Sequence, residues 1–469
     1  MTLIYGTELV MKIMHSFAAA CAVGTIVAVS AAQVPARADA LQDALVQAYQ
    51  NNPTLLAERA RLRATDESVA QALSNWRPTV SISGDAGYQF RSRTTTGNGK
   101  GSDTTLPRGA QLSIDQNVYR GGRTTAATRR ADNLVRSDRA RLLRTEQSVI
   151  LSAVTAYVGA VRDQAVLELN INNERVLRRQ LEATRDRFSV GEVTRTDVAQ
   201  AESRLSRATA ERVRAEGDLV NSRATYKNVV GSAPGKLSAT KPLKDLTANE
   251  SETVNMARER SFVVVEADFV ERAARDQVDL VTGELLPTVT LSGDMSRDFE
   301  SINSESETDT VSLTANLSVP LYQSGSVSSR IREAKQVVAQ RRNDRNRAVR
   351  DATEEGTRAW EDLVTARARI RSFTSEVRAG EIALEGVQQE ALVGSRTVLD
   401  VLDAEQELLD ARVSLVRAER DEVVAAYQLR SAVGQLTAES LNLPVKKYDF
   451  TKNYRRVRNK WFGLGIDKE

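Results

Sequence analysis

PTVSISGD, residues Pro78–Asp85, returns almost unchanged as PTVTLSGD at Pro287–Asp294, 209 residues further along the chain. Only two of the eight positions differ, and both differences conserve the character of the side chain. Apolar and polar residues alternate in each copy. Strict alternation indicates a β-strand with one apolar and one hydrated face, because successive side chains of a strand point to opposite sides. The chain therefore contains a duplicated amphipathic strand.

The repetition extends through most of the 469 residues. VYRGGR at 118–123 corresponds to LYQSGS at 321–326, and VGEVTRTDVAQAE from Val190 corresponds to VGSRTVLDVLDAE from Val393, both at an offset of 203 residues. A unit of about 200 residues is too long for a solenoid repeat, so each copy is expected to be one structural unit. The expected bounds are a first repeat at 41–234, a second repeat at 235–440 and a C-terminal segment at 441–469.

Each repeat is expected to contain a strand hairpin, at 78–120 in the first and at 287–322 in the second. The segments between the strands, 91–108 and 300–309, are polar, and we expect unstructured loops there that face the exterior. They differ in length, as surface loops tolerate, and this explains the change of offset from 209 to 203. Arg297 is an exception on the expected apolar side. That side carries Val80, Ile82, Ala86, Leu112, Ile114, Val118, Val289, Leu291, Met295, Phe299, Val311, Leu313, Ala315, Leu317 and Val319.

Two interpretations of these hairpins are open. A single alternating run is more often a half-buried strand of a soluble sheet, whereas four such runs in an exported chain favour a sheet whose apolar face meets lipid. Four strands cannot close a barrel, and an open edge in hydrocarbon leaves backbone groups without partners. A membrane sheet therefore requires several protomers to pool their strands.

Residues 1–40 are expected to form a secretory signal peptide. An uncharged run from Ile13 to Ala36 follows Lys12, and candidate cleavage sites follow at Ala38 and Ala40. The run is also long enough for an N-terminal membrane anchor, but the small-residue pattern directly after it favours cleavage.

Cleavage would leave a chain without cysteine or histidine, because Cys21 and His15 are the only residues of these types. This excludes thiol nucleophiles, disulfides, Cys/His metal sites and imidazole catalysis, so we expect no cofactor and no enzymatic activity. The 65 Lys and Arg residues nearly balance the 62 Asp and Glu residues, which gives no electrostatic footprint for nucleic acid.

Most of the remaining chain is expected to be helical. Two runs without proline, 124–188 and 327–392, would each extend about 100 Å as a helix. Ile150, Val154 and Val158 form part of an apolar stripe in the first run. Returning helices would complete long hairpins at 124–230 and 327–434. The other expected helices are 53–75, 196–230, 254–281 and 397–433.

This order of elements resembles the TolC family of outer-membrane efflux channels, over the mature chain from end to end. The most specific parts are VGSRTVLDVLDAEQELLDAR from Val393 and LVQAYQNNPTLLAERA from Leu45. The resemblance implies an α+β membrane protein that forms a homotrimer. Each protomer would give four strands to one twelve-stranded outer-membrane β-barrel, continued by a periplasmic α-helical coiled-coil barrel with a mixed α/β equatorial belt.

The resemblance also implies a function and partners. The channel would export drugs, toxic compounds or secreted polypeptides, the last by type I secretion, together with an inner-membrane transporter of the RND or ABC type and a periplasmic adaptor. Its surroundings would be outer-membrane lipid. The alternative is a periplasmic coiled-coil adaptor or scaffold, which also uses long helical hairpins but is expected to lack paired amphipathic strand hairpins.

The candidate site lies at the tips of the two helical hairpins. Thr194 with Asp197, and Thr397 with Asp400, fit the Ser/Thr-x-x-acid pattern of a helix N-cap. Asp403 lies beyond the capping positions, on the same helix face as Asp400, where like charges repel. The resemblance implies that Asp400 and Asp403 line a pore constriction and that Thr196, Asp197 and Arg396 belong to a gate-closing network. Ala391 stands where well-known members have a tyrosine, so one closing link of that network is expected to be absent or replaced.

Overall fold

The structure is a computed structural model that describes residues 41–94, 100–240, 243 and 247–466. The expected signal peptide and its cleavage sites lie outside these residues. The helices are α1 (Leu41–Asn51), α2 (Pro53–Ser74), α3 (Arg123–Ser189), α4 (Arg195–Val230), α5 (Glu250–Arg260), α6 (Phe262–Thr282), α7 (Ser326–Leu392), α8 (Val398–Ala432) and α9 (Phe450–Arg458), with a 3-10 turn η1 at Gly283–Leu285. The strands are β1 (Thr79–Ala86), β2 (Gln89–Thr94), β3 (Lys100–Thr105), β4 (Arg108–Arg120), β5 (Thr288–Phe299) and β6 (Glu307–Ser318).

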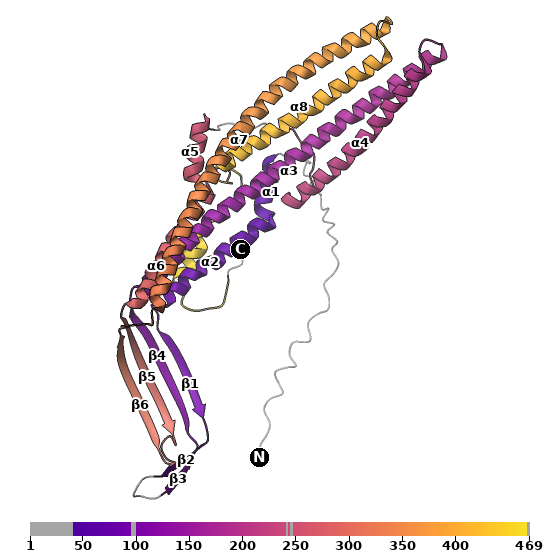
Figure 1. Cartoon of the computed structure of the whole chain (residues 1–469). Coiled ribbons are helices and arrows are strands. Elements are labelled where there is room, and N and C mark those ends of the chain that lie inside the picture. Colours follow the sequence, from indigo (N-terminus) through magenta and orange to yellow (C-terminus); the bar gives the residue numbers. More distant parts are fainter. Residues whose placement is uncertain (1–40, 95–99, 241–242, 244–246, 467–469) are drawn as a thin grey trace, which may run out of the picture. The chain divides into compact units, whose positions relative to one another are not determined.

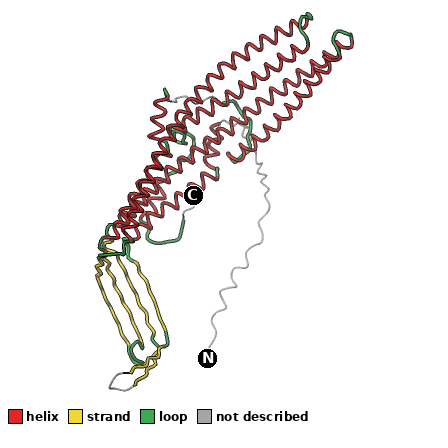
Figure 2. Tube along the Cα trace, in the orientation of Figure 1, coloured by secondary structure: helices red, strands yellow, loops and turns green. Residues whose placement is uncertain are grey.

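The four long strands form one antiparallel sheet with the order β1-β4-β5-β6. β4 pairs with β5, so the hairpin of the first repeat joins the hairpin of the second in the same sheet (Figure 1). The outer strands β1 and β6 each pair on one side only within the part of the chain that the structure describes. All strands gather at one end of the described unit, and the helices occupy the rest (Figure 2).

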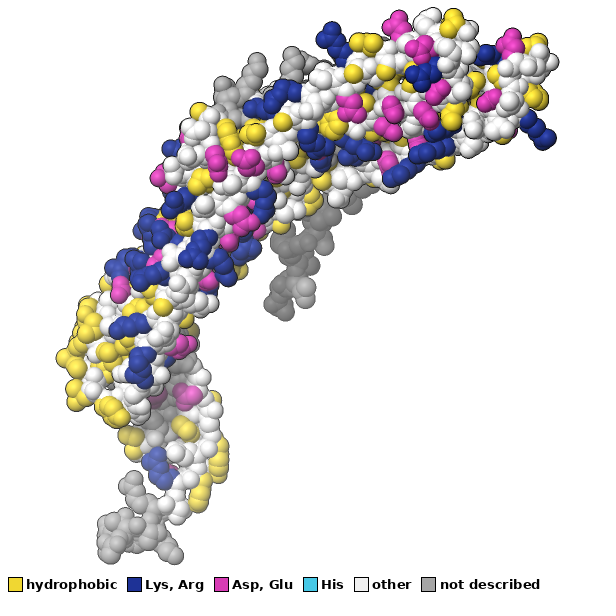
Figure 3. Space-filling view, turned by 45° about the horizontal axis from the view of Figure 1, so that its top comes forward, with side chains coloured by type: hydrophobic (Ala, Val, Ile, Leu, Met, Phe, Trp, Pro, Cys, Tyr) yellow, Lys and Arg dark blue, Asp and Glu magenta, His cyan; other side chains and the backbone are white. Residues whose placement is uncertain are grey.

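The register places the alternating side chains on two continuous faces. One transverse row contains Ile82, Leu112, Met295 and Val311, one residue from each strand. Leu313 lies on the same face and is 75% exposed. Hydrophobic side chains gather over the sheet, whereas charged side chains are spread along the helices (Figure 3). Nothing in the described chain covers this apolar face, as the lipid-facing prediction requires.

Polar side chains bond across the strands on the opposite face. Ser81 Oγ and Ser113 Oγ lie 2.7 Å apart. Gln111 Nε2 donates to Asp294 Oδ1 at 3.1 Å, and Ser292 Oγ donates to Asp115 Oδ1 at 2.7 Å. These cross-strand bonds stabilise the sheet while leaving a hydrated surface.

Two residues depart from the expected alternation. A β-bulge between Asn117 and Tyr119 makes Val118 an additional residue, so Val118 does not continue the apolar row of β4. Arg297 lies on the apolar face, but close to the end of β5, where its guanidinium pairs with Glu307 and with Asp309. The charge of Arg297 is thus compensated at the edge of the apolar region.

The expectation of an unstructured loop at 91–108 is wrong. β2 pairs with β3 in a separate antiparallel ribbon, from Gln89 opposite Thr105 to Thr94 opposite Lys100. Threonine favours strands, and pairing of the two segments keeps their backbone groups hydrogen-bonded. The second loop is shorter than expected because β6 begins at Glu307.

The single helix expected at 254–281 is two helices. Ser261 has φ −57° and ψ 129°, an extended conformation that ends α5, and α6 begins at Phe262. A helix at α1 was also not predicted. In the region of the expected equatorial belt, the described residues contain α5, α9 and irregular segments, and no strand outside β1–β6.

The long helices α3 and α7 each contain 67 residues and pack antiparallel against α4 and α8, respectively. The largest buried cluster lies where α1 and α2 cover α3, and it contains Leu45, Leu55, Ile150, Val154 and Tyr157. α3 includes a window apolar enough to cross a membrane, but 56% of that window is buried inside the fold. Its apolar residues are therefore explained by this core.

The sheet joins the helices through a close contact between two glycines. Gly121, in the turn between β4 and α3, has φ +60°, which favours glycine. A Cβ atom at Gly283, after α6, would lie 2.5 Å from the Gly121 carbonyl oxygen and 2.6 Å from Arg123 Cγ. The backbones of the two repeats can approach this closely only without side chains at this junction.

Replacing Gly283 with Ala should lower the stability of the protein by about 1–3 kcal/mol, because the added methyl group meets fixed backbone. Gly283 has an ordinary helical conformation, so the effect would be steric and not conformational. Gly217→Ala is the matched control, since a Cβ there meets nothing within 4 Å. It should stabilise α4 by about 0.5–1 kcal/mol. Thermal unfolding followed by circular dichroism distinguishes the two, and equal midpoints would contradict the steric argument.

Candidate functional site

The two hairpin tips have the same backbone geometry. Gly191 and Gly394, in the turns after α3 and α7, have φ values of +80° and +82°, a left-handed conformation that requires little energy only for glycine. Thr194 and Thr397 then cap α4 and α8. The repeated sequence thus builds the same turn twice.

Both tips contain the predicted capping box. The backbone N–H and the hydroxyl of Thr397 each donate to Asp400 Oδ2 at 2.8 Å, and the Asp400 backbone N–H donates to Thr397 Oγ1 at 3.3 Å. Thr194 and Asp197 make the same three bonds. Hydrogen bonds from the Thr397 backbone and hydroxyl lower the pKa of Asp400 below its usual value. Asp400 therefore carries a negative charge at neutral pH.

Arg396 connects the two helices of its own hairpin. Its Nε donates to Glu390 Oε2, in the last turn of α7, at 2.8 Å. Its Nη1 lies 4.0 Å from Asp400 Oδ1. Among the described residues no hydrogen bond or ion pair joins Arg396 to Thr196 or Asp197, and Thr196 is exposed in the first turn of α4. The predicted closing network is therefore not assembled within one protomer.

Asp403 makes the contact that links the two hairpins near their tips. Its Oδ1 accepts a short charge-assisted hydrogen bond from Nη2 of Arg204 on α4. The side chains are 52% and 27% exposed, respectively, so water still reaches the pair. Arg204 was not predicted as a site residue. The sequence feature that could have indicated Arg204 is a difference between the repeats. At the offset of 203, Glu407 corresponds to Arg204 and Gln200 corresponds to Asp403.

An apolar cluster supports this ion pair. Val398 and Leu402 of α8 are buried against Leu177 and Leu181 of α3 and Ala201 of α4. The first turns of α8 therefore rest on the α3–α4 hairpin. The cluster is small, and all of its members are alanine, valine or leucine.

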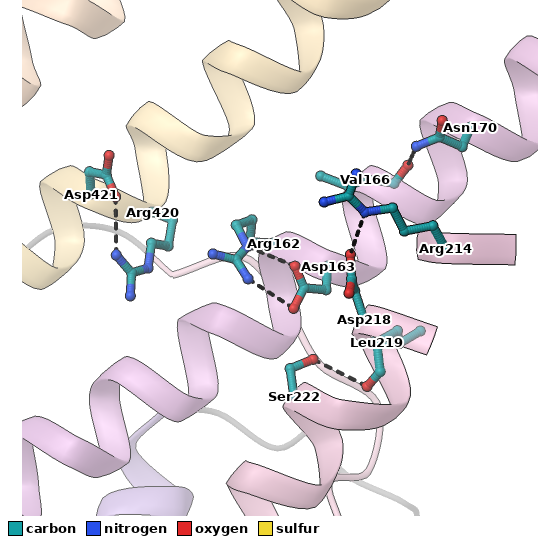
Figure 4. A network of polar contacts seen from close by, with 10 residues as sticks. All are labelled: Arg162, Asp163, Val166, Asn170, Arg214, Asp218, Leu219, Ser222, Arg420 and Asp421. Atoms are coloured by element: carbon teal, nitrogen blue, oxygen red, sulfur yellow. Dashed lines mark hydrogen bonds and ion pairs between the residues drawn. The ribbon is translucent and has the colours of Figure 1, made fainter. Parts of the chain in front are cut away.

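Further from the tips, the hairpins are separated by a polar groove of about 380 Å³. Asn170, Arg214 and Asp218 line one side, and Asp410 and Arg417 of α8 line the other. The charged residues near it pair within their own hairpins: Arg162 Nε donates to Asp163 Oδ1 at 2.7 Å, and Arg420 Nη1 donates to Asp421 Oδ1 at 3.1 Å (Figure 4). Asp421 also pairs with Arg369 of α7, at 3.3 Å. The bond to Asp163 raises the pKa of Arg162. The groove contributes few bonds between α8 and the first hairpin.

No group of three or more His, Cys, Asp or Glu side chains in the described part of the chain is arranged to hold a metal ion. The tips present carboxylates, guanidinium groups and helix caps. Such an arrangement can attract cations to the tips and can join or release neighbouring helices.

Known proteins resemble this chain over most of its length. The sequence model of the outer membrane efflux protein family matches residues 44–232 and 253–435, one segment in each repeat. The chain is 34% identical over 431 residues to the outer membrane efflux protein BepC of Brucella suis biovar 1 (strain 1330), and the match covers 92% of each sequence. It is 28% identical to the outer membrane protein TolC of Vibrio cholerae, covering 86% of this chain and 92% of that one.

Two further similarities concern secretion and fold. The proteases secretion protein PrtF of Dickeya chrysanthemi is 27% identical over 308 residues, covering 63% of this chain and 66% of PrtF. The crystal structure of the Campylobacter jejuni CmeC outer membrane channel superposes with a TM-score of 0.77, covering 89% of each chain at 15% identity. The fold of this chain is thus that of the TolC-like channels.

Replacing Arg204 with Gln should loosen the first turns of α8, because it removes the partner of Asp403. A partly exposed ion pair contributes up to about 1 kcal/mol, so amide hydrogen exchange in residues 399–406 should accelerate by at most roughly fivefold. Arg207→Gln is the control, since Arg207 pairs with Glu211 within α4. Exchange that is equally fast in both variants, or unchanged in Arg204→Gln, would exclude a role for the inter-hairpin pair.

Proposed function

This chain belongs to the outer membrane efflux protein family, and we propose that three copies of it close one channel. The protein is an outer-membrane channel with a periplasmic tunnel, and its relatives serve efflux and type I secretion. The alternative of a periplasmic adaptor is not supported by these relatives. The observation that carries the proposal is the four-stranded sheet with an uncovered apolar face and two unpaired edges, attached to the long helical hairpins.

The unpaired edges require neighbours. β6 presents twelve residues and β1 presents eight, and each unsatisfied backbone group in hydrocarbon costs several kcal/mol. Pairing β1 of one protomer with β6 of the next is a head-to-tail contact, which closes into a ring when the rotation fits. We infer a ring of three, with twelve strands, in which the hydrated face lines the lumen and the apolar face meets outer-membrane lipid.

The domain organisation that we propose follows the two repeats. Residues 1–40 would direct export and be removed. The repeats 41–234 and 235–440 would each supply a strand hairpin to the barrel and a helical hairpin to the tunnel, with 441–469 as the C-terminal segment. The hairpins formed by α3 with α4 and by α7 with α8 are the parts that support this division.

The channel would act with an inner-membrane transporter of the RND or ABC type and a periplasmic adaptor. The channel itself has no described motif for energy conversion, so the transporter would supply the driving force. The cargo would be drugs or toxic compounds in efflux, or polypeptides in type I secretion, and the similarity to the proteases secretion protein PrtF supports the second possibility.

The gate would lie at the hairpin tips. In a trimer, Asp400 and Asp403 would provide six carboxylates around the constriction, and Thr196, Asp197 and Arg396 would join neighbouring coils between protomers. Arg204 adds a link within each protomer, through its pair with Asp403. Ala391 offers no side-chain bond at its position in α7, so the closed state would depend more strongly on the remaining links.

Arg at Val311 or Leu313, near the middle of β6, should impair assembly into the outer membrane, because a lipid-facing Arg near the bilayer centre costs roughly 2–4 kcal/mol. Arg at Thr314 or Asn316, on the opposite face, should be tolerated and should change the conductance. The four positions are neighbours on β6, which makes them matched controls. The measurement is the amount of heat-modifiable oligomer in isolated outer membranes. Equal losses at both sets would show that the faces were assigned wrongly.

The proposed gate residues have two roles, negative charge in the passage and links between helices, and different variants test each role. The variant Asp400→Asn with Asp403→Asn should reduce both the preference for cations and the block by multivalent cations, because six charges leave a narrow hydrated passage. It should also raise the resting conductance, because Asp403→Asn breaks the ion pair with Arg204. Arg204→Gln should raise the resting conductance but keep the cation preference, since it breaks the pair and leaves the Asp403 carboxylate. Arg396→Gln should also raise the resting conductance.

Planar-bilayer recording of the purified protein measures both quantities. Asp410→Asn is the control, because Asp410 is an exposed acid further along α8 that pairs with Gln406 in its own helix. The gate proposal fails if this control changes selectivity as much as the Asp400 and Asp403 pair, or if neither arginine variant alters the resting conductance.

A further inference from the structure

Residues 460 and 461 of the C-terminal segment lie beside the point where the sheet begins. Arg77 lies two residues before β1, and its guanidinium stacks on the Trp461 ring at 4.8 Å. Its Nη1 also donates to the Lys460 carbonyl oxygen at 2.6 Å. Residues 460 and 461 are therefore level with the end of the sheet that adjoins the helices.

This position is fixed by contacts of α9 with the helical core. Asn453 Nδ2 donates to Asp66 Oδ2 of α2 at 2.8 Å, and Tyr454 Oη donates to Asp132 Oδ1 of α3 at 2.6 Å. Val457 is buried. α9 is thus docked on α2 and α3. The residues that follow it are exposed although the helix before them is held in place by these contacts.

The composition of the segment is one-sided. From Phe450 to Ile466 it has five basic residues and no acidic residue, namely Lys452, Arg455, Arg456, Arg458 and Lys460. Four large apolar side chains follow and are 66–102% exposed within the described chain, namely Trp461, Phe462, Leu464 and Ile466. Trp76 is also partly exposed at the same end of the sheet, where its carbonyl oxygen accepts from Gln116 of β4 at 2.6 Å.

We propose that residues 455–466 bind the phospholipid surface at the periplasmic side of the outer membrane. The basic side chains would contact lipid phosphates, and Trp461, Phe462, Leu464 and Ile466 would enter the boundary between headgroups and acyl chains. Tryptophan concentrates at this boundary, and short segments that combine basic and large apolar residues lie along it. The inference rests on the proposed membrane placement of the sheet, which puts this lipid surface at the level of Trp461.

A phospholipid is favoured over a protein partner for two reasons. Residues 450–466 offer positive charge without any acidic residue, which matches anionic headgroups along this stretch. Trp461, the first of the exposed apolar residues, also stands at the level of the sheet end, where a membrane-spanning sheet meets the bilayer surface, and Trp76 is exposed there too.

Fluorescence quenching by brominated phospholipids tests the proposal in the full chain. The chain has three tryptophans, so the variant Trp76→Phe with Trp360→Phe reports on Trp461 alone. In bilayers containing anionic phospholipid brominated near the headgroup end of the acyl chains, its emission should fall at least about twofold. The variant Trp76→Phe with Trp461→Phe reports on Trp360, in the helical bundle on α7, and its emission should not change.

A third variant separates this inference from the proposed function. With all three tryptophans replaced by Phe, the added substitution Leu313→Trp should be quenched if the apolar face of the sheet meets lipid. Quenching of this variant without quenching of Trp461 overturns the tail inference alone, whereas loss of quenching in both overturns the membrane placement of the sheet. Trp461 that is shielded from brominated lipid and also from aqueous iodide would be covered by a neighbouring protomer, which likewise overturns the inference.

A separate experiment tests whether the basic side chains of α9 bind lipid phosphates. Arg455→Gln with Arg456→Gln should weaken the quenching of Trp461 by anionic bilayers and have little effect in neutral ones. Lys446→Gln with Lys447→Gln is the charge-matched control, because Lys447 pairs with Glu439, before α9. Equal quenching in both pairs of variants would exclude phosphate recognition by α9.

Discussion

Backbone N–H and C=O groups in hydrocarbon have no water to bond with, and this constraint governs the structure from the strands outward. It explains why an amphipathic strand occurs in hairpins, why the β4–β5 ladder joins both hairpins of the protomer, and why β1 and β6 still need partners. The side chains suit the same surroundings, because the row through Ile82, Leu112, Met295 and Val311 presents an apolar face to hydrocarbon. The long helices carry no such demand, because each satisfies its own backbone groups and its surface can be charged.

The helical end is held together by weaker and more local means. Each hairpin is closed by a glycine turn and a Thr–Asp capping box, which are the same in both repeats. Near their tips, the hairpins touch each other through a small apolar cluster and the Arg204–Asp403 pair, with a polar groove behind them. Contacts of this kind are individually worth little in water. In the proposed gate, tips joined this weakly would open without disturbing the sheet.

The sequence predicted the elements that depend on local pattern. Residues 124–188 and 327–392 lie almost coincident with α3 and α7, and the capping boxes at Asp197 and Asp400 are formed as expected. The errors arose where tertiary pairing decides. The polar segment after Gln89 pairs with itself as β2 and β3, and the extended conformation of Ser261 interrupts an otherwise helical pattern. The contact of Arg204 with Asp403 depends on which helices become neighbours, and periodicity within one helix contains no information about that.

The β4–β5 pairing also has a consequence for the assembly of the proposed ring of three. If the two hairpins belonged to separate chains, six molecules would have to meet, and every encounter would depend on dilution. Covalent linkage gives the second hairpin an effective concentration near the first in the millimolar range for short connections, and less for longer ones. Half of the hairpin junctions then form within single chains. Only the β1–β6 junctions remain sensitive to the level of expression, so the yield of closed rings should vary with the third power of protomer concentration instead of the sixth.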